Sequence, residues 1–105
     1  MTTILEIERH APDCLVNPDA VKAMMALEMK KPELFKKYGV TQLGLWYVKS
    51  EHFVVYVFEA PSFEAFLQLQ DEPEVEHWRM HTTAEFKVAM NGGEVAKLLQ
   101  KAASK

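Results

Sequence analysis

Two kinds of hydrophobic pattern divide this chain. Alternation with a period of two is typical of a β-strand, whereas recurrence every three or four positions is typical of an amphipathic helix. This alternation occurs in residues 3–10, and further strands are predicted over residues 40–48, 52–60 and 82–90. The second and third stretches are rich in β-branched and aromatic residues and are joined by the short segment 49–51, which predicts a hairpin.

Helical spacing fills most of the remaining chain. Asn17, followed by a proline, is a suitable N-cap for a first helix, and Gly39 is a suitable C-cap. Pro32 lies within this segment and is expected to interrupt it. A second helix is predicted after Ser62, a short helical turn at Pro73, and an amphipathic helix at the C-terminus.

The order of the predicted elements indicates the fold. A β-α-β-β-α-β chain with a trailing C-terminal helix predicts a ferredoxin-like α+β domain that occupies residues 1–105 as a single unit. Right-handed crossovers then give a four-stranded antiparallel sheet with the first and third strands in the centre. Both helices between strands cover the same face of this sheet, and the other face is left bare.

The hydrophobic pattern of the third strand indicates how the bare face of the sheet is covered. Hydrophobic residues occupy both of its faces, and a strand of this kind must be covered on both sides. One face carries Val54, Tyr56 and Phe58, and the other carries Phe53, Val55 and Val57. No remaining segment is large enough to cover the second face, so we expect a homodimer in which two sheets pack face to face. Association also suits a chain of 105 residues, because small domains bury a small share of their surface.

Charge and cysteine content narrow the classes of partner and compartment. The net charge is −3 and the chain has no dense basic run, which argues against nucleic acid and anionic membranes as partners. A single cysteine excludes an intrachain disulfide and favours a reducing cytoplasm. The N-terminal residues do not read as a signal peptide, and no apolar stretch approaches the ~18 residues that span a bilayer. We therefore expect a soluble cytoplasmic protein.

Several segments resemble known families. The stretch HFVVYVFEAPSFEAF, residues 52–66, is similar to antibiotic-biosynthesis-monooxygenase-type domains of the dimeric α+β barrel superfamily. The motifs HAPDC, NPDA and KYGV are similar to small bacterial ferredoxin-like families of unknown function. The resemblance covers roughly residues 3–90 and implies a dimeric barrel. Members of the superfamily include monooxygenases, haem-degrading enzymes, isomerases and metal binders, so the resemblance implies no single activity.

The first strand offers one candidate site. Glu6, Glu8 and His10 share a face, while the leucine and isoleucine between them suit the helix side. We therefore expect the ionisable residues to point into the space between the two sheets of the dimer. If this space is enclosed, burial raises the carboxyl pKa values; if Lys87 on the neighbouring strand pairs with a glutamate, the pKa is lowered instead.

The histidines and the single cysteine offer a second candidate site, for a metal ion. The fold places the end of the first strand near the start of the fourth, so His10, Cys14, His77 and His81 form a pool of ligands for zinc or nickel. Glu59 is expected at this end of the sheet and His52 at the opposite end. The alternative is that these are surface histidines and a small buried cysteine.

Aromatic residues offer a third candidate site. Tyr56 and Trp78 are candidates to line a pocket for a flat apolar molecule, although aromatic residues at such spacing also fill cores. The resemblance implies that such pockets serve cofactor-independent monooxygenases, and that haem, where it is bound, is held by a histidine near the second helix, here His77.

Three functions remain open from the sequence. The first is a protein that binds a small ligand or a transition metal in or at the edge of the inter-sheet cavity. The second is a cofactor-independent monooxygenase or isomerase for a small aromatic or polyketide-like substrate, with Glu8, His10 or His77 as the catalytic candidates. The third is a structural interaction module.

Overall fold

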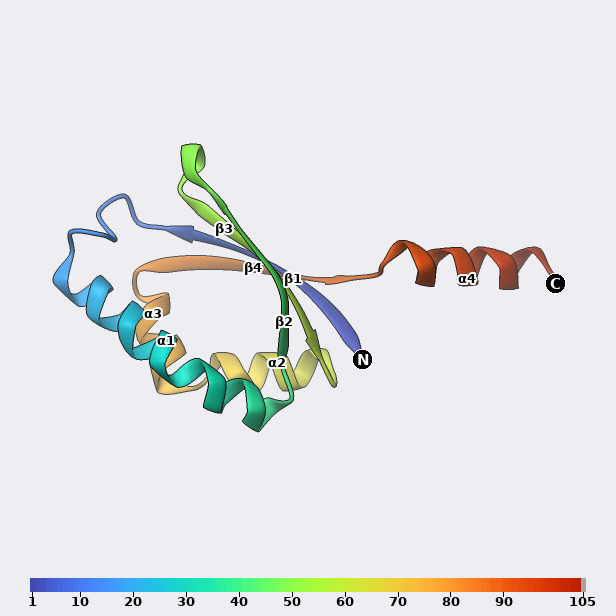
Figure 1. Cartoon of the computed structure of the whole chain (residues 1–105), viewed down its shortest axis with the longest axis horizontal. Coiled ribbons are helices and arrows are strands. Elements are labelled where there is room, and N and C mark those ends of the chain that lie inside the picture. The colour runs from blue at the N-terminus through green and yellow to red at the C-terminus, as the bar shows by residue number, and fades with distance from the viewer. Residues whose placement is uncertain (105) are drawn as a thin grey trace.

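The computed structural model describes residues 1–104 and contains a four-stranded sheet with helices against one face (Figure 1). The strands are β1 (Thr2–His10), β2 (Thr41–Val48), β3 (Phe53–Ala60) and β4 (Thr82–Ala89). The helices are α1 (Pro18–Tyr38), α2 (Phe63–Gln70), α3 (Pro73–Arg79) and α4 (Gly92–Ala103). A 3-10 turn, η1 (Lys49–Glu51), joins β2 to β3.

The strand order is β2-β3-β1-β4, and every neighbouring pair is antiparallel. This order places β1 and β3 in the centre and confirms the predicted ferredoxin-like α+β topology. Because β1 and β3 run in opposite directions, the end of β1 lies beside the start of β3, where Arg9 pairs with Phe53. The same end of β1 lies beside the start of β4, where His10 pairs with Thr82.

Helix α1 begins and ends where its caps predict. The Asn17 side chain accepts hydrogen bonds from two backbone N–H groups of the first turn, and Gly39 closes the helix with a left-handed φ of 70°. The predicted interruption at Pro32 was wrong, because α1 continues through it. The proline removes one backbone N–H from the helix, and the buried residues on either side, Leu27 and Leu34, keep both halves packed on the sheet.

The helix-facing side of the sheet contains the core. Ile4, Phe58 and Phe66 are each at most 4% exposed there. Val54, Tyr56 and Phe58 face the helices, while the alternate residues of β3, among them Val55, face the open side.

The orientation of β1 corrects a prediction. Glu6 and Glu8 are buried on the helix-facing side, and Leu5 and Ile7 face the open side. The expectation that the carboxylates point between two sheets was wrong. Ile4 shares their face and provides the core contact that we had assigned to Leu5 and Ile7.

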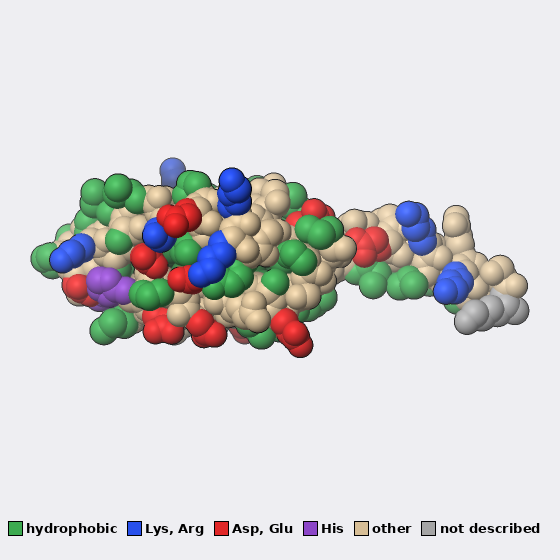
Figure 2. Space-filling model, turned by 90° about the horizontal axis from the view of Figure 1, so that it is seen from below, with side chains coloured by type: hydrophobic (Ala, Val, Ile, Leu, Met, Phe, Trp, Pro, Cys, Tyr) green, Lys and Arg blue, Asp and Glu red, His purple; other side chains and the backbone are tan. Residues whose placement is uncertain are grey.

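Helix α4 extends away from the rest of the protein (Figures 1 and 2). None of its residues is buried, and the hydrophobic side chains Val95, Leu98 and Leu99 are 42%, 53% and 65% exposed. Within residues 1–104, no helix combines the length and the apolar composition that crossing a membrane requires.

Candidate functional site

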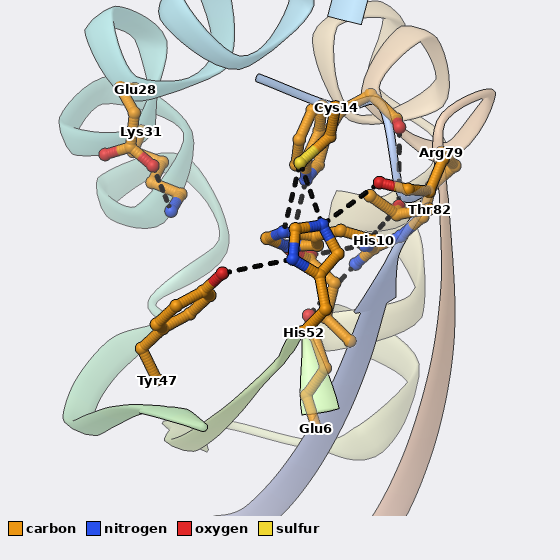
Figure 3. A network of polar contacts seen from close by, with 12 residues as sticks. Glu6, His10, Cys14, Glu28, Lys31, Tyr47, His52, Arg79 and Thr82 are labelled. Atoms are coloured by element: carbon orange, nitrogen blue, oxygen red, sulfur yellow. Dashed lines mark hydrogen bonds and ion pairs between the residues drawn. The ribbon is translucent and has the colours of Figure 1, made fainter. Parts of the chain in front are cut away.

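Two carboxylates and one guanidinium lie together on the helix-facing side of the sheet, and Figure 3 shows the network of polar contacts to which Glu6 and Arg79 belong. Glu6 and Glu8, on the central strand β1, are each 3% exposed. Arg79, the last residue of α3, reaches both: its Nη1 lies 2.6 Å from Glu8 Oε2, and its Nη2 lies 3.2 Å from Glu6 Oε2. A buried charge is tolerated when it is paired and hydrogen-bonded, so the position of Arg79 allows β1 to carry these residues.

The two carboxylates differ in their other partners. Glu8 Oε1 also accepts a hydrogen bond from the Trp78 indole at 3.2 Å and lies 2.8 Å from His10 Nε2. Arg79 donates further bonds to Gln70 Oε1 at 3.1 Å and Thr82 Oγ1 at 3.3 Å. Glu8 is therefore surrounded by donors, whereas Glu6 shares a single guanidinium with it.

This difference separates the pKa values of the two carboxyls. Burial raises the pKa of Glu6 to about 7; Arg79 opposes this increase, and the charge of Glu8 adds to it. Burial also acts on Glu8, but the hydrogen bond from His10 and the charge of Arg79 outweigh it and lower that pKa to about 2. At neutral pH, Glu8 is the carboxylate that balances Arg79, and Glu6 is poised between its neutral and ionised forms.

A cavity of about 90 Å³ opens beside these residues, between the sheet and the helices. Its lining contains both apolar and polar side chains. The apolar side chains are Met24, Leu27, Leu34, Phe35, Phe58, Phe66, Leu69 and Val75. The polar or ionisable ones are Glu6, Glu8, His10, Glu28, Lys31, Tyr56, Gln70, Trp78 and Arg79.

Tyr56 and Lys31 lie where the cavity meets α1. The Lys31 Nζ lies 5.3 Å from the centre of the Tyr56 ring and 2.7 Å from Glu28 Oε1. Tyr56 is also the register partner of Glu6, so the two side chains are neighbours on the helix-facing side. Among residues 1–104 the Tyr56 hydroxyl has no hydrogen-bond partner, and burial raises its pKa far above the ordinary value. It is a neutral donor at the polar end of the cavity.

A second polar group lies at the end of β1. Cys14 Sγ lies 3.1 Å from His52 Nε2 and 3.9 Å from His10 Nδ1. Cys14 is buried, and this burial, together with the charge of Asp13, raises the pKa of its thiol. The thiol is therefore protonated near neutral pH unless a metal displaces the proton.

His77 and His81 form a separate group with Asp19. The His77 Nε2 lies 3.0 Å and the His81 Nε2 lies 2.6 Å from Asp19 Oδ2. Asp19 is in the first turn of α1, and its contacts tie this turn to α3 and the segment that follows. The hydrogen bonds from the two histidines lower the pKa of Asp19.

The structure thus divides the ligand pool that the sequence predicted. His10 and Cys14 lie together as expected, but His77 and His81 belong to a different group. The exclusion of His52 was wrong, and so was the inclusion of Glu59, which pairs with Thr3 at the other end of β1. Both errors have one cause: the third strand is antiparallel to the first, so its start and not its end lies beside His10.

The sequence did not identify the cation that pairs with Glu6 and Glu8. Lys87 pairs with Leu5 on the open side of the sheet, so it is not the partner of the glutamates. Arg79 is that partner, and nothing in the hydrophobic spacing distinguishes it from a surface arginine. The available signal was that two buried carboxylates need a cation, but this requirement does not select among the twelve lysines and arginines of the chain.

Comparisons with known proteins address the fold. No protein-family model matches the chain, and no curated protein matches it. The structure is similar to that of protein Atu4242 from Agrobacterium tumefaciens, with 16% identity, a TM-score of 0.60, and coverage of 88% of this chain and 94% of that one. It is also similar to an uncharacterized NIPSNAP domain protein from Burkholderia xenovorans, with 13% identity, a TM-score of 0.50, and coverage of 88% and 97%. These likenesses show the fold alone.

The pKa difference predicts opposite effects for two matched substitutions. Because the pKa of Glu6 is raised in the folded state, the free energy of unfolding should fall as pH rises from 4.5 to about 7, by up to about 3 kcal/mol, and level off above it. Glu6→Gln should remove this fall and be at least as stable as the wild type at pH 8. Glu8→Gln should cost about 3 kcal/mol at pH 7, because it leaves Arg79 under-compensated.

Urea unfolding followed by circular dichroism at several pH values measures these effects. The polar and ionisable groups around Glu6 are Glu8 on its own strand, Tyr56 on β3, Gln70, Arg79, and the Glu28–Lys31 pair of α1. Glu51→Gln, at an exposed position in η1, is the control and should change stability by less than about 0.5 kcal/mol. Equal losses for the Glu6 and Glu8 variants at every pH would contradict the assignment.

Proposed function

We propose that this protein binds a small organic molecule in the cavity between its sheet and its helices. The molecule would have a largely apolar, flat body and one hydrogen-bonding group. One observation carries the proposal: beside its apolar lining the cavity presents the neighbouring side chains of Glu6 and Tyr56, whose polar atoms are not fully used by residues 1–104. Unused polar groups in an apolar cavity orient a ligand and discriminate between ligands.

The polar end sets the chemistry of the ligand. Arg79 is committed to Glu8, so it offers little to an anion. The Tyr56 hydroxyl can donate to a carbonyl or hydroxyl oxygen, and Glu6 can either donate or accept near pH 7. A neutral phenol, enol or ketone suits such a pair better than a carboxylate or phosphate does.

Phenol is a suitable probe, with toluene as its matched partner. Phenol should shift the backbone amide resonances of residues that line the cavity, and Tyr56→Phe should weaken phenol binding about fivefold while leaving toluene unaffected. Tyr47→Phe, outside the cavity, is the control. Met24→Trp, which fills the cavity from α1, should abolish both signals. Shifts elsewhere in the protein, or unchanged binding in the Met24 variant, would refute the cavity as the site.

Proton transfer is a second candidate function, and the pairing of Glu6 with Tyr56 favours it. The Glu6 carboxylate can remove a proton from the carbon next to a ketone, and the Tyr56 hydroxyl can donate a hydrogen bond to the enolate oxygen that forms. Return of the proton from Glu6 to the opposite face of that carbon, or to another carbon of a conjugated enolate, completes an isomerisation. A base is most effective when its pKa lies near the working pH.

Deuterium exchange into acetone tests this chemistry. The protein should accelerate exchange, the rate should rise with pH through about 7 as Glu6 ionises, and Glu6→Gln should remove both the acceleration and the pH dependence. If the Glu6 variant exchanges acetone as fast as the wild type but still binds phenol, the chemistry fails and ligand binding stands.

We also propose that the protein is a homodimer through the open face of its sheet, in keeping with its resemblance to dimeric α+β barrels. Ile7, Val55 and Trp46 lie side by side across three strands of this face, and the Trp46 side chain is 59% exposed. The Trp46 indole lies over Gly44. A Cβ atom at this position would come within 2.6 Å of two ring carbons, so glycine leaves room for the ring. A second copy of the sheet would cover this surface, and the exposed hydrophobic side of α4 would find a partner in the same assembly.

Light scattering tests the assembly. The wild type should have twice the 12.0 kDa chain mass at micromolar concentration, and Val55→Lys should give a monomer or an aggregate, because it buries an unpaired charge in the interface. Met29→Lys, on the outer surface of α1 where Met29 is 83% exposed, is the control and should remain dimeric. A monomeric wild type would rule out the dimer.

A further inference from the structure

We propose a zinc site formed by His10, Cys14 and His52. The three residues come from the end of β1, the loop that follows it, and the residue before β3. One imidazole nitrogen from each histidine and the cysteine sulfur lie within 4.8 Å of one another (Figure 3). The proposal requires no ligand in the neighbouring cavity.

The distances suit a tetrahedral ion. With Zn–S near 2.3 Å and Zn–N near 2.0–2.1 Å, a tetrahedral angle separates sulfur and nitrogen by about 3.6 Å. The observed separations from Cys14 Sγ are 3.1 Å to His52 Nε2 and 3.9 Å to His10 Nδ1, on either side of this value. A thiolate and two imidazoles form a donor set that zinc prefers, and three protein ligands leave the fourth position for water or an exogenous ligand.

The outer nitrogens of both imidazoles are already held by oxygen partners. His10 turns Nδ1 toward Cys14, and its Nε2 lies 2.8 Å from Glu8 Oε1. His52 turns Nε2 toward Cys14, and its Nδ1 lies 3.3 Å from the Tyr47 hydroxyl. A carboxylate or hydroxyl behind a ligating histidine fixes the tautomer and orientation of the ring, and such partners are usual around metal sites. The carboxylate of Glu8 also supplies negative charge near the ion.

The backbone of His52 supports the same conclusion. His52 has φ 56° and ψ 45°, the left-handed region that glycine or asparagine adopts more easily. Histidine is among the residues found in this region, and the turn brings its ring beside Cys14. The His52 Nε2 also lies 3.0 Å from the Ala11 carbonyl oxygen, and a bound zinc ion would replace this hydrogen bond.

The group of Asp19, His77 and His81 provides a contrast. Both imidazole Nε2 atoms there are directed at a single carboxylate that is 53% exposed, and the group has no sulfur ligand. Hydrogen bonding between α1 and α3 accounts for this arrangement, so these histidines serve as the internal control.

Calorimetric titration of untagged protein with ZnCl₂ tests the site. We expect one zinc per chain, with an affinity at least about 100-fold weaker in Cys14→Ser and in His52→Asn, and unchanged in the double variant His77→Gln, His81→Gln. His52→Asn is chosen because asparagine tolerates the left-handed conformation, so the variant should fold as stably as the wild type in the presence of EDTA. Tyr47→Phe should weaken zinc binding about 10-fold without removing a ligand.

Cobalt provides a spectroscopic test that does not depend on affinity. Co²⁺ bound to the wild type should give a thiolate-to-metal charge-transfer band in the near ultraviolet, and Cys14→Ser should lack it while its circular dichroism spectrum stays unchanged. No band in the wild type, zinc binding that survives in Cys14→Ser, or binding lost only in the His77 and His81 variant would each overturn the proposal. None of these outcomes depends on phenol binding or acetone exchange.

Discussion

The contact of Arg79 with Glu6 and Glu8 is the constraint on which the rest of this structure depends. A central strand facing two helices would ordinarily bury apolar side chains, and two carboxylates there require a cation within reach. Helix α3 provides it by ending at Arg79, and Trp78 beside it donates a further hydrogen bond to Glu8. The cavity opens beside these side chains, and their polar atoms form part of its wall.

A single guanidinium cannot satisfy two carboxylates equally. Glu8 has Arg79, Trp78 and His10 as neighbours and stays ionised, whereas Glu6 keeps only the longer contact with Arg79. Inside the low dielectric of the core, this inequality appears as two well separated pKa values. Pairs of titratable groups whose environments differ in this way are common where proton transfer or polar recognition takes place.

The fold was predictable from the sequence because its signals are local. The run of β-branched and aromatic residues in β3, the Asn17 cap and the Gly39 cap each depend on neighbouring residues, and together they indicate the order of the elements. The faces of β1 were not predictable in the same way: Leu5 and Ile7 suggest the core, and only the partner on α3 reveals that Glu6 and Glu8 occupy it. His52 and Asp19 were missed because their partners are distant in the chain, although the antiparallel pairing of β1 with β3 already implied that His52 lies beside His10.

His10 connects the two candidate sites through its two ring nitrogens. If Nδ1 binds a metal, the imidazole must carry its proton on Nε2, and that proton is donated to Glu8 at the observed 2.8 Å. Glu8 then remains an anion that holds Arg79, so Glu6 is left as the carboxyl that changes its protonation state near neutral pH. Zinc at one end of β1 would therefore maintain the polar end of the cavity without touching its occupant. The central strand carries Glu6 and His10, and its antiparallel register with β3 places Tyr56 beside Glu6 and the start of β3, next to His52, beside the end of β1.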